Sequence, residues 1–366
     1  MTQRIMHLAY DGYSVEVVAA SSPEAARWEQ EMEEAGIRLP FSHRLASAEL
    51  EPHPGPLFFM IRDADGAPCG GFAAQRRLSR ALPGHFLLRV ERFGAALPAE
   101  SRAVGVRALA DLSRMTPRVL RTYLGVFTPE LSVQQEIAFH AEAVGFRRSP
   151  APRSYNNTIL VDLRPNEEEI FASFQSKTRR DIRAAAKFPV TVRPIEEAEL
   201  AGRLDSLVNE VFARTGGDSE RQNWIDIIRF SARHSELSRL VGLFRTDIAG
   251  PESLLAFAHG LHHGDYAEYS TAAATRNTDI RVPQTYVLAW DMMRWAKRHG
   301  AAFFDFGGVT PVTSDGSDPL QGISAFKRYF SKEEFSVGDE WILEPSRLKA
   351  NLARVVTSVA KSVAKS

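Results

Sequence analysis

Residues 303–330 begin with Phe303-Phe304-Asp305-Phe306-Gly307-Gly308 and end with Gly322-Ile323-Ser324-Ala325-Phe326-Lys327-Arg328-Tyr329-Phe330. The aromatic run is typical of a buried strand, the glycine pair ends it, and Asp318-Pro319 can open a helix. Lys327 would then lie beyond a central strand, where an ammonium can hold a phosphate or a developing oxyanion. The alternative is an ordinary amphipathic helix with Lys327 in water, and the spacing alone favours that alternative.

The composition is that of a globular protein with two domains. The chain has 366 residues, of which 44% are hydrophobic and 25% charged. Lys+Arg and Asp+Glu both number 45, so the net charge indicates neither a nucleic-acid nor a membrane partner. The single cysteine, Cys69, excludes an intrachain disulfide framework and a cysteine-based metal site. Without a secretion signal or an apolar run near 18 residues, we expect a soluble, cytoplasmic protein.

The second half of the chain alternates strand and helix patterns. Asn166 and Glu169 predict a capping box for one helix, Glu167–Lys187, which ends before Pro189. The other expected elements are a strand at 190–193, helices near 200–212 and 224–228, strands at 239–245, 254–262 and 266–273, a helix at 283–298, a strand at 303–306, a helix containing Phe326 and a strand at 335–343.

The first half repeats the same kind of order. Its expected elements are strands at 15–19, 57–62, 69–76, 86–92, 120–127 and 157–163, with helices at 23–35, 98–114 and 132–144. An α/β fold with a mixed sheet and helices on both faces, built twice, is the simplest architecture. We therefore expect domains at 1–163 and 164–345, followed by a basic amphipathic tail helix at 346–366.

One expected helix carries a cluster of bases. At about 100° per residue, Arg179, Arg180, Arg183 and Lys187 share one sector, with Lys177 beside it. Residues 176–187 hold five bases and one acid, a net charge of +4. This concentration suits a phosphodiester backbone, whereas most charge runs are solvated helix faces, and both interpretations stay open.

The order of elements matches the acyl-N-transferase (GNAT) fold, and its duplication resembles the FemABX family. Members of that family have tandem GNAT domains and move an amino acid from aminoacyl-tRNA to an amine of a peptidoglycan precursor. The resemblance is carried by the basic helix within 161–187, the segment 290–308 with its tryptophan helix and Asp-Phe-Gly-Gly turn, and the Phe-Lys segment within 322–330. It covers residues 150–345 well and residues 1–150 by order of elements alone. It implies two GNAT-like domains around a shared cleft.

The resemblance also implies roles for individual residues. Lys327 would hold the diphosphate of a nucleotide- or lipid-linked acceptor, or stabilise the transition state, and Phe326 would offer a face to the terminal adenine of the tRNA. The basic cluster would contact the acceptor end of the tRNA. Tyr266 and Tyr269 are odd-spaced and face opposite sides of a strand, and the family pattern favours Tyr269 as the one that reaches the cleft.

Two arginines flank a glycine break between helices. Arg214 and Arg221 lie on either side of Gly216-Gly217, where a loop could close over a substrate. Ordinary surface arginines are the favoured alternative.

Three histidines form an apparent metal cluster. His259 alternates away from His262 along a strand, and His263 falls in the following turn, so their rings diverge. No carboxylate lies at helical ligand spacing, and we expect no zinc site.

Acyl-CoA is the competing donor. In this fold its pyrophosphate is cradled by a Gln/Arg-x-x-Gly-x-Gly/Ala segment at a helix N-terminus. Residues 276–283 hold no glycine and end in a proline, which has no N–H. The near-match at 102–107 lies inside an expected helix. Acyl-CoA is therefore disfavoured, and neither a metal nor a tightly held cofactor is expected.

The chain departs from the family at three places. It lacks the helical hairpin that many members have inserted in the second half, and in this it resembles the compact members of the family. It also has Thr128-Pro129 where many members carry an acidic residue before proline. A carboxylate base at that point is therefore in doubt. The tail has five bases and no acid, and it would pack on the first domain, lie on an anionic membrane or assist tRNA binding.

These patterns and the resemblance together predict an aminoacyltransferase that uses aminoacyl-tRNA as co-substrate and an amine of a peptidoglycan precursor or similar molecule as acceptor. The alternatives are an acyl-CoA-dependent N-acyltransferase acting on a sugar, lipid or small-molecule amine, and an inert tRNA- or glycolipid-binding module.

Overall fold

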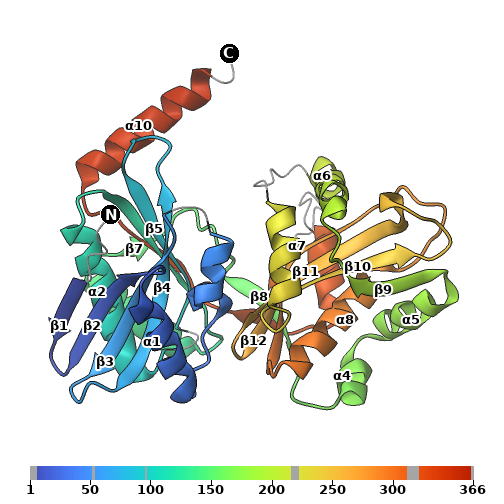
Figure 1. Ribbon diagram of the computed structural model, residues 1–366, viewed down its shortest axis with the longest axis horizontal. Helices are drawn as coiled ribbons and strands as arrows, with labels where there is room; N and C mark the ends of the chain where they lie inside the picture. The colour runs from blue at the N-terminus through green and yellow to red at the C-terminus, as the bar shows by residue number, and fades with distance from the viewer. Residues whose placement is uncertain (1–5, 52–53, 95–96, 216–221, 311–320, 364–366) are drawn as a thin grey trace. The chain divides into compact units, whose positions relative to one another are not determined.

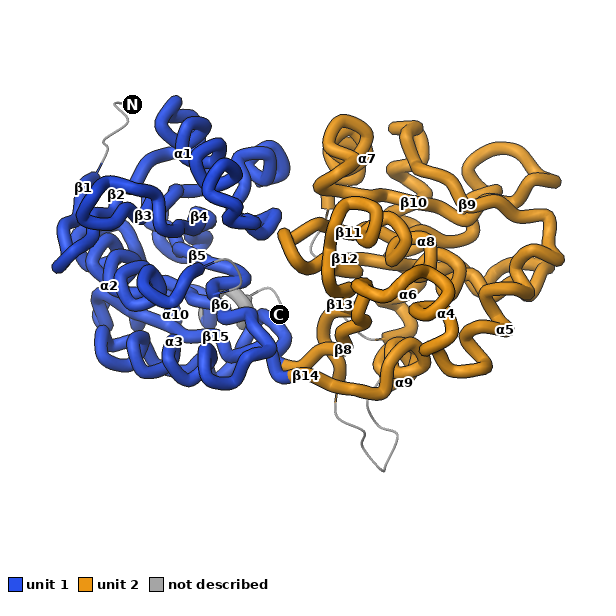
Figure 2. The backbone as a smooth tube through the Cα atoms, turned by 90° about the horizontal axis from the view of Figure 1, so that it is seen from below, with its two compact units in different colours: residues 1–156, 336–366 blue, residues 157–335 orange. Residues whose placement is uncertain are grey.

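A computed structural model describes residues 6–51, 54–94, 97–215, 222–310 and 321–363. Its chain divides into two compact units, one made of Met1–Asn156 with Ser336–Ser366 and the other of Asn157–Phe335 (Figure 2). Each unit is a sheet with helices on both faces (Figure 1), which confirms the predicted α/β architecture.

The first unit contains an eight-stranded mixed sheet in the order β1-β2-β3-β4-β5-β6-β15-β7. Strands β5 and β6 run parallel and are joined by helix α2, whereas the other neighbours pair antiparallel. The elements are β1 (Met6–Tyr10), β2 (Tyr13–Ala19), α1 (Pro23–Glu34), β3 (Leu57–Asp63), β4 (Pro68–Leu78), β5 (Phe86–Phe93), α2 (Ala99–Met115), β6 (Val119–Val126), α3 (Leu131–Ala143), β7 (Arg147–Arg148), β15 (Glu340–Leu343) and α10 (Arg347–Val363).

Alternation along the strands supplies a core on each face of this sheet. Phe59 and Phe72 stack at 4.5 Å between ring centroids and lie in the cluster that includes Leu109 of α2. Phe58 points to the other face, where it packs against Trp28 of α1. Because neighbouring residues of a strand face opposite sides, adjacent apolar residues bury both layers.

The second unit contains a seven-stranded sheet in the order β14-β8-β13-β12-β11-β10-β9. Strands β12 and β13 run parallel and are joined by α8, while β9 to β12 and the β13–β8 pair are antiparallel. The elements are β8 (Asn157–Asp162), α4 (Glu167–Ser173), α5 (Ser176–Ala184), β9 (Val190–Pro194), α6 (Ala201–Thr215), α7 (Trp224–Arg233), β10 (Ser238–Arg245), β11 (Leu254–His263), β12 (Tyr266–Ala274), α8 (Gln284–Arg298), β13 (Phe303–Gly308), α9 (Gln321–Arg328) and β14 (Glu334–Ser336).

The predicted single helix at 167–187 is wrong, because the chain breaks at Phe174. The capping box of Asn166 and Glu169 is confirmed and starts α4. Phe174 then adopts an extended conformation (ψ 154°), and its buried ring packs 5.6 Å from Trp290 and 5.1 Å from Phe330. The aromatic packing outweighs the helical pattern, and the bases of 176–187 lie on the separate helix α5 and the 3-10 turn after it.

The strand expected at 335–343 is two strands that belong to different sheets. Between them Gly338 has φ +114°, and the chain then pairs β15 antiparallel with β6, Trp341 opposite Leu124. Strand β8, expected to close the first domain, pairs instead with β13 in the second unit. The chain therefore passes from one unit to the other between residues 156 and 157 and back between residues 335 and 336. The sequence patterns placed these boundaries after residues 163 and 345.

Replacing Gly338 by alanine is expected to destabilise the first unit by about 2–4 kcal/mol. An added Cβ would lie 2.7 Å from Val126 Cγ1 and 3.2 Å from the Val126 carbonyl oxygen, at a φ that alanine rarely adopts. Gly12→Ala is the control in the same unit, since its φ is +74° but a Cβ there meets nothing within 4 Å, and it should cost about 1 kcal/mol. Urea unfolding gives both values. Equal losses in the two variants would contradict the close packing of Gly338.

Candidate active site

Lys327 is buried at the end of strand β13. It is 8% exposed, and its Nζ donates a hydrogen bond of 2.5 Å to the carbonyl oxygen of Gly308. Helix α9 is fixed by Phe330, which is buried, and by Phe326, which packs 6.1 Å from Phe306. The alternative of a solvated lysine on an amphipathic helix is therefore wrong.

The burial of Lys327 changes its acid–base behaviour. Loss of solvation lowers the pKa of its ammonium to about 8, and the carboxylates of Asp305 and Glu268 oppose this shift. At pH 7 the group is still mostly protonated, roughly nine molecules in ten. It is thus a cation in a poorly solvated place, where its charge acts more strongly than at the surface.

Asp305 organises the glycine turn that faces Lys327. This carboxylate is fully buried, and its Oδ1 accepts hydrogen bonds from the Thr158 hydroxyl (2.5 Å) and the Gly307 N–H (2.9 Å). Gly307 has φ +72°, so the turn uses a conformation that favours glycine. Sequence reasoning assigned no role to Asp305, Thr158 or Glu268. An acid inside an aromatic strand followed by two glycines was the signal that could have found Asp305.

The two strand tyrosines face opposite sides of the sheet, as their spacing predicts. Tyr266 stacks on Phe303 at 5.5 Å, whereas Tyr269 contacts Phe304 and Phe306. The Tyr269 hydroxyl is buried without a hydrogen-bond partner among the described residues, and burial raises its pKa. A buried hydroxyl without a partner is uncommon, which makes Tyr269 the more informative of the two.

Phe326 is one of a group of aromatic rings. It packs 5.1 Å from Tyr286 and 5.3 Å from Phe330, in addition to Phe306, and it stays half-buried. The predicted stacking with a base would have to use the part of the ring that these neighbours leave exposed.

The two arginines near the glycine break are only partly described. Arg214 is exposed at the end of α6, and its Nε donates to the Glu210 carbonyl oxygen at 3.0 Å. Two effects lower the pKa of Arg214, of which partial desolvation is the larger and the charge of the neighbouring Arg276 the smaller. Arg221 and Gly216-Gly217 lie outside the described residues. Their role in closing over a substrate stays a prediction.

Two of the five clustered bases form hydrogen bonds within the second unit. Lys177 Nζ lies 2.7 Å from Asp181 Oδ2 and donates to the Tyr286 hydroxyl at 2.9 Å. Partial burial acts to lower the pKa of Lys177, but these two hydrogen bonds outweigh it and raise the pKa. Arg179 donates to the Ala172 carbonyl oxygen at 2.8 Å and to that of Phe174, and so caps the end of α4.

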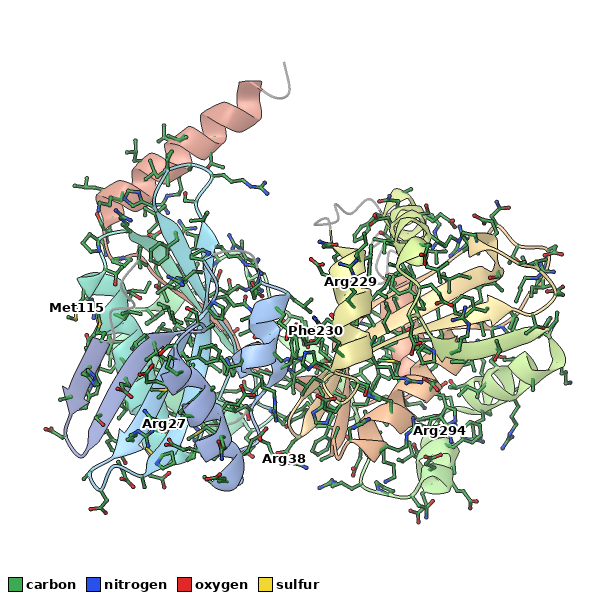
Figure 3. All side chains as sticks on the ribbon, viewed as in Figure 1. Arg27, Arg38, Met115, Arg229, Phe230 and Arg294 are labelled. Carbon is green, nitrogen blue, oxygen red and sulfur yellow. The ribbon has the colours of Figure 1, made fainter. Side chains whose placement is uncertain are left out.

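The other three bases face a groove or solvent. A groove of about 720 Å³ lies between α4, α5 and α8. Arg183 covers the Phe171 ring at 5.0 Å, and Arg180 and Lys187 are exposed. Arg294, labelled in Figure 3, donates to Glu167 at 2.8 Å. The residues lining the groove are Glu167, Glu168, Phe171, Ala172, Arg179, Ile182, Arg183 and Trp290.

The three histidines have separate surroundings. His259 Nε2 lies 3.0 Å from the Ser238 hydroxyl, and burial lowers its pKa to about 4. His263 Nε2 lies 3.1 Å from Glu268 Oε2, and the His262 ring packs edge-on against Trp295. Among the described residues, no group of three or more His, Cys, Asp or Glu could hold a metal ion.

The segment before α8 does not fit a pyrophosphate. Two backbone N–H groups of this segment already donate hydrogen bonds to side chains. That of Asn277 donates to the Thr275 hydroxyl at 3.0 Å, and that of Ile280 donates to the Thr278 hydroxyl at 3.4 Å. The helix then begins after Pro283, which has no N–H. In the first unit, Gly105 lies within α2 and packs against Phe72 and Phe93 rather than opening a helix.

Comparisons with known proteins agree with this topology. A family model described as "Acetyltransferase (GNAT) domain" matches residues 172–328. A crystal structure of FemX matches with a TM-score of 0.69 and 16% identity, over 93% of this chain and 96% of that one. The chain has a tandem GNAT fold. A structure of L-PGS from Bacillus licheniformis matches with a TM-score of 0.50 and 13% identity, over 94% and 98% of the two chains. No curated protein matches the sequence. The second unit of this tandem GNAT chain contains an acyltransferase domain, and the low identities show the fold alone.

The free energy of unfolding should depend on pH because the Lys327 ammonium is buried in the folded protein. Below about pH 8 the ammonium is charged in both states and its burial disfavours folding, whereas above about pH 10.5 it is neutral in both. Between these values the unfolded chain binds more protons, so stability rises with pH by up to about 3 kcal/mol. Lys327→Met should lack this rise.

Urea unfolding at pH 7.5 and pH 10 measures the difference. Lys332→Met, at an exposed position, is the control and should keep the wild-type pH dependence. A stability difference between wild type and Lys327→Met that is the same at both pH values would contradict the buried ammonium.

Proposed function

We propose that this protein is an aminoacyltransferase of the FemABX type, which uses aminoacyl-tRNA as donor and an amine of a peptidoglycan precursor or a similar nucleotide- or lipid-linked molecule as acceptor. The observation that carries the proposal is the buried Lys327 ammonium beyond the end of β13. The fold likeness to FemX and the basic residues of α5 support it. That the site lies in a cleft shared by the two domains stays a prediction.

The proposed reaction is aminolysis of an activated ester. The acceptor nitrogen attacks the ester carbonyl carbon, a C–N bond forms, and the bond to the ribose oxygen breaks. The oxygen leaves as a hydroxyl with the proton that the amine gives up. Lys327 would stabilise the oxyanion that forms between these steps, or hold the acceptor phosphates. An ammonium already desolvated by the protein needs little reorganisation to do so. The Tyr269 hydroxyl, which has no hydrogen-bond partner in the part of the chain that the structure describes, is a candidate hydrogen-bond donor to the substrate.

The groove beside α5 supports the tRNA part of the proposal. Its lining places two arginines beside the rings of Phe171 and Trp290, the pairing of groups that binds unpaired nucleotides, together with the carboxylates of Glu167 and Glu168. Its volume lies within the range of small-ligand sites. Arg180 and Lys187, exposed near it, would contact phosphates that extend from the groove.

Acyl-CoA-dependent N-acyl transfer is the second candidate, and the match of residues 172–328 to a GNAT acetyltransferase domain favours it. The poor fit of the segment before α8 to a pyrophosphate argues against it. An inert tRNA- or glycolipid-binding module would show no turnover with either donor.

Turnover with a mixed, radiolabelled aminoacyl-tRNA pool tests the activity and the role of Lys327. Labelled amino acid should appear on an amine acceptor, and acyl-CoA thioesters should not be consumed. Lys327→Ala should reduce turnover about 100-fold or more, because it removes the charge that stabilises the oxyanion. Lys332→Ala, at an exposed position, is the matched control and should leave turnover unchanged. Unchanged turnover in folded Lys327→Ala would remove this residue from the mechanism, and consumption of acyl-CoA alone would favour the second candidate.

Charge reversal on α5 tests the tRNA surface. The Arg180→Glu/Arg183→Glu variant should bind tRNA more weakly and reduce the slope of log K against log salt by about 1.5–2. Arg229→Glu/Arg298→Glu changes two exposed bases on α7 and α8 by the same charge and should keep the wild-type slope (Arg229 is labelled in Figure 3). Filter binding at several salt concentrations gives both slopes. Equal slopes for the two variants would contradict a specific role of α5.

A further inference from the structure

Helix α10 exposes an apolar face. Four of its residues are apolar and unusually accessible: Leu348 is 83% exposed, Leu352 53%, Val355 59% and Val356 38%. At about 100° per residue they fall within one sector roughly 100° wide. A surface helix normally turns such a sector toward the core, so this arrangement calls for another partner.

The opposite side of α10 holds it to the first unit. Ala350, which is 2% exposed, lies roughly opposite the centre of the apolar sector. Lys349 Nζ donates to the Pro117 carbonyl oxygen at 2.7 Å, and Arg354 lies 3.4 Å from Glu344. These contacts fix the start of the helix, and Figure 1 shows α10 extending from the rest of this unit. The anchored side and the apolar face are thus separate, and the apolar face is directed away from the body to which the helix is attached.

Charge complementarity selects one class of partner. Residues 346–366 contain five bases and no acid. The preceding acid, Glu344, is shared by Arg121 at 2.6 Å, Arg147 at 2.8 Å and Arg354 at 3.4 Å, so its single charge leaves the tail basic. Two copies meeting through this face would bring like charges together. An anionic lipid surface supplies both the negative potential and the apolar layer that the helix lacks.

We propose that α10 attaches this protein to the surface of anionic membranes, with Leu348, Leu352, Val355 and Val356 in the boundary between headgroups and acyl chains. The helix lies on the bilayer rather than across it, since no helix in the described part of the chain is long and apolar enough to span one. The attachment is independent of the catalytic proposal, because it involves none of the residues assigned to transfer.

Sedimentation of the full-length protein with vesicles tests the attachment. Vesicles of phosphatidylcholine with 30% phosphatidylglycerol should bind the protein at least about tenfold more tightly than pure phosphatidylcholine vesicles, and added salt should weaken the binding. Leu352→Ser/Val355→Ser should reduce binding to the anionic vesicles about tenfold or more, because it removes apolar area from the inserted face. Asn351→Ser/Thr357→Ser, outside the apolar sector of the same helix, should bind as wild type does.

A second measurement reports on the environment of the helix itself. Tryptophan emission from Leu352→Trp should shift to the blue with anionic vesicles and not with neutral ones or with tRNA, relative to the wild-type protein. Equal binding to both kinds of vesicle, or no binding to either, overturns the proposal. It is also overturned if the wild-type protein self-associates without lipid and Leu352→Ser/Val355→Ser is monomeric, since a second copy would then cover the face. Loss of tRNA affinity in that variant without loss of vesicle binding assigns the helix to tRNA instead. Thermal unfolding of each variant shows that it is folded.

Discussion

The carboxylate of Asp305 is fully buried, so its hydrogen bonds must come from the protein rather than from water. These hydrogen bonds determine the geometry of the candidate site. The Thr158 hydroxyl and the Gly307 N–H both approach Oδ1, which holds the glycine turn in place. That turn presents the Gly308 carbonyl oxygen to the Lys327 ammonium. The buried Asp305 carboxylate therefore positions the buried Lys327 ammonium through the backbone of Gly307 and Gly308. The negative charge of Asp305 also favours the cation that its own turn receives.

The same topology is used in both units. Each has a parallel strand pair joined by a helix, β5-α2-β6 in the first and β12-α8-β13 in the second. In each, an antiparallel strand lies beside the second strand of the pair, β15 next to β6 and β8 next to β13. Each parallel pair also contains a backbone irregularity, although in strands that do not correspond: Arg92 of β5 has φ +51°, and the register of β13 against β8 shifts between Asp305 and Gly308. Both catalytic candidates, Lys327 and Tyr269, lie in the second unit.

Much of this fold could be predicted from the sequence, because most of its elements have strong local patterns. The hairpin β11–β12, the helix after Pro283 and the capping box at Asn166 all agree with expectation. The failures are non-local. Nothing local to Phe174 shows that its ring will find Trp290 and Phe330, and nothing local to 340–343 shows that this strand pairs with β6. At the site, the sequence pattern singled out Lys327 as a candidate, but its burial depends on the packing of Phe306, Phe326 and Phe330, which only the folded chain brings together.

The pairing of β15 has a consequence for how the molecule is made. The strand that lies between β6 and β7 is encoded after the whole of the second unit. During synthesis on the ribosome, residues 1–156 therefore emerge with the edge of β6 open, while the unit encoded later obtains all of its strands first. The first unit is thus completed only after the second, and the edge of β6 has to stay unpaired until residues 340–343 have been made.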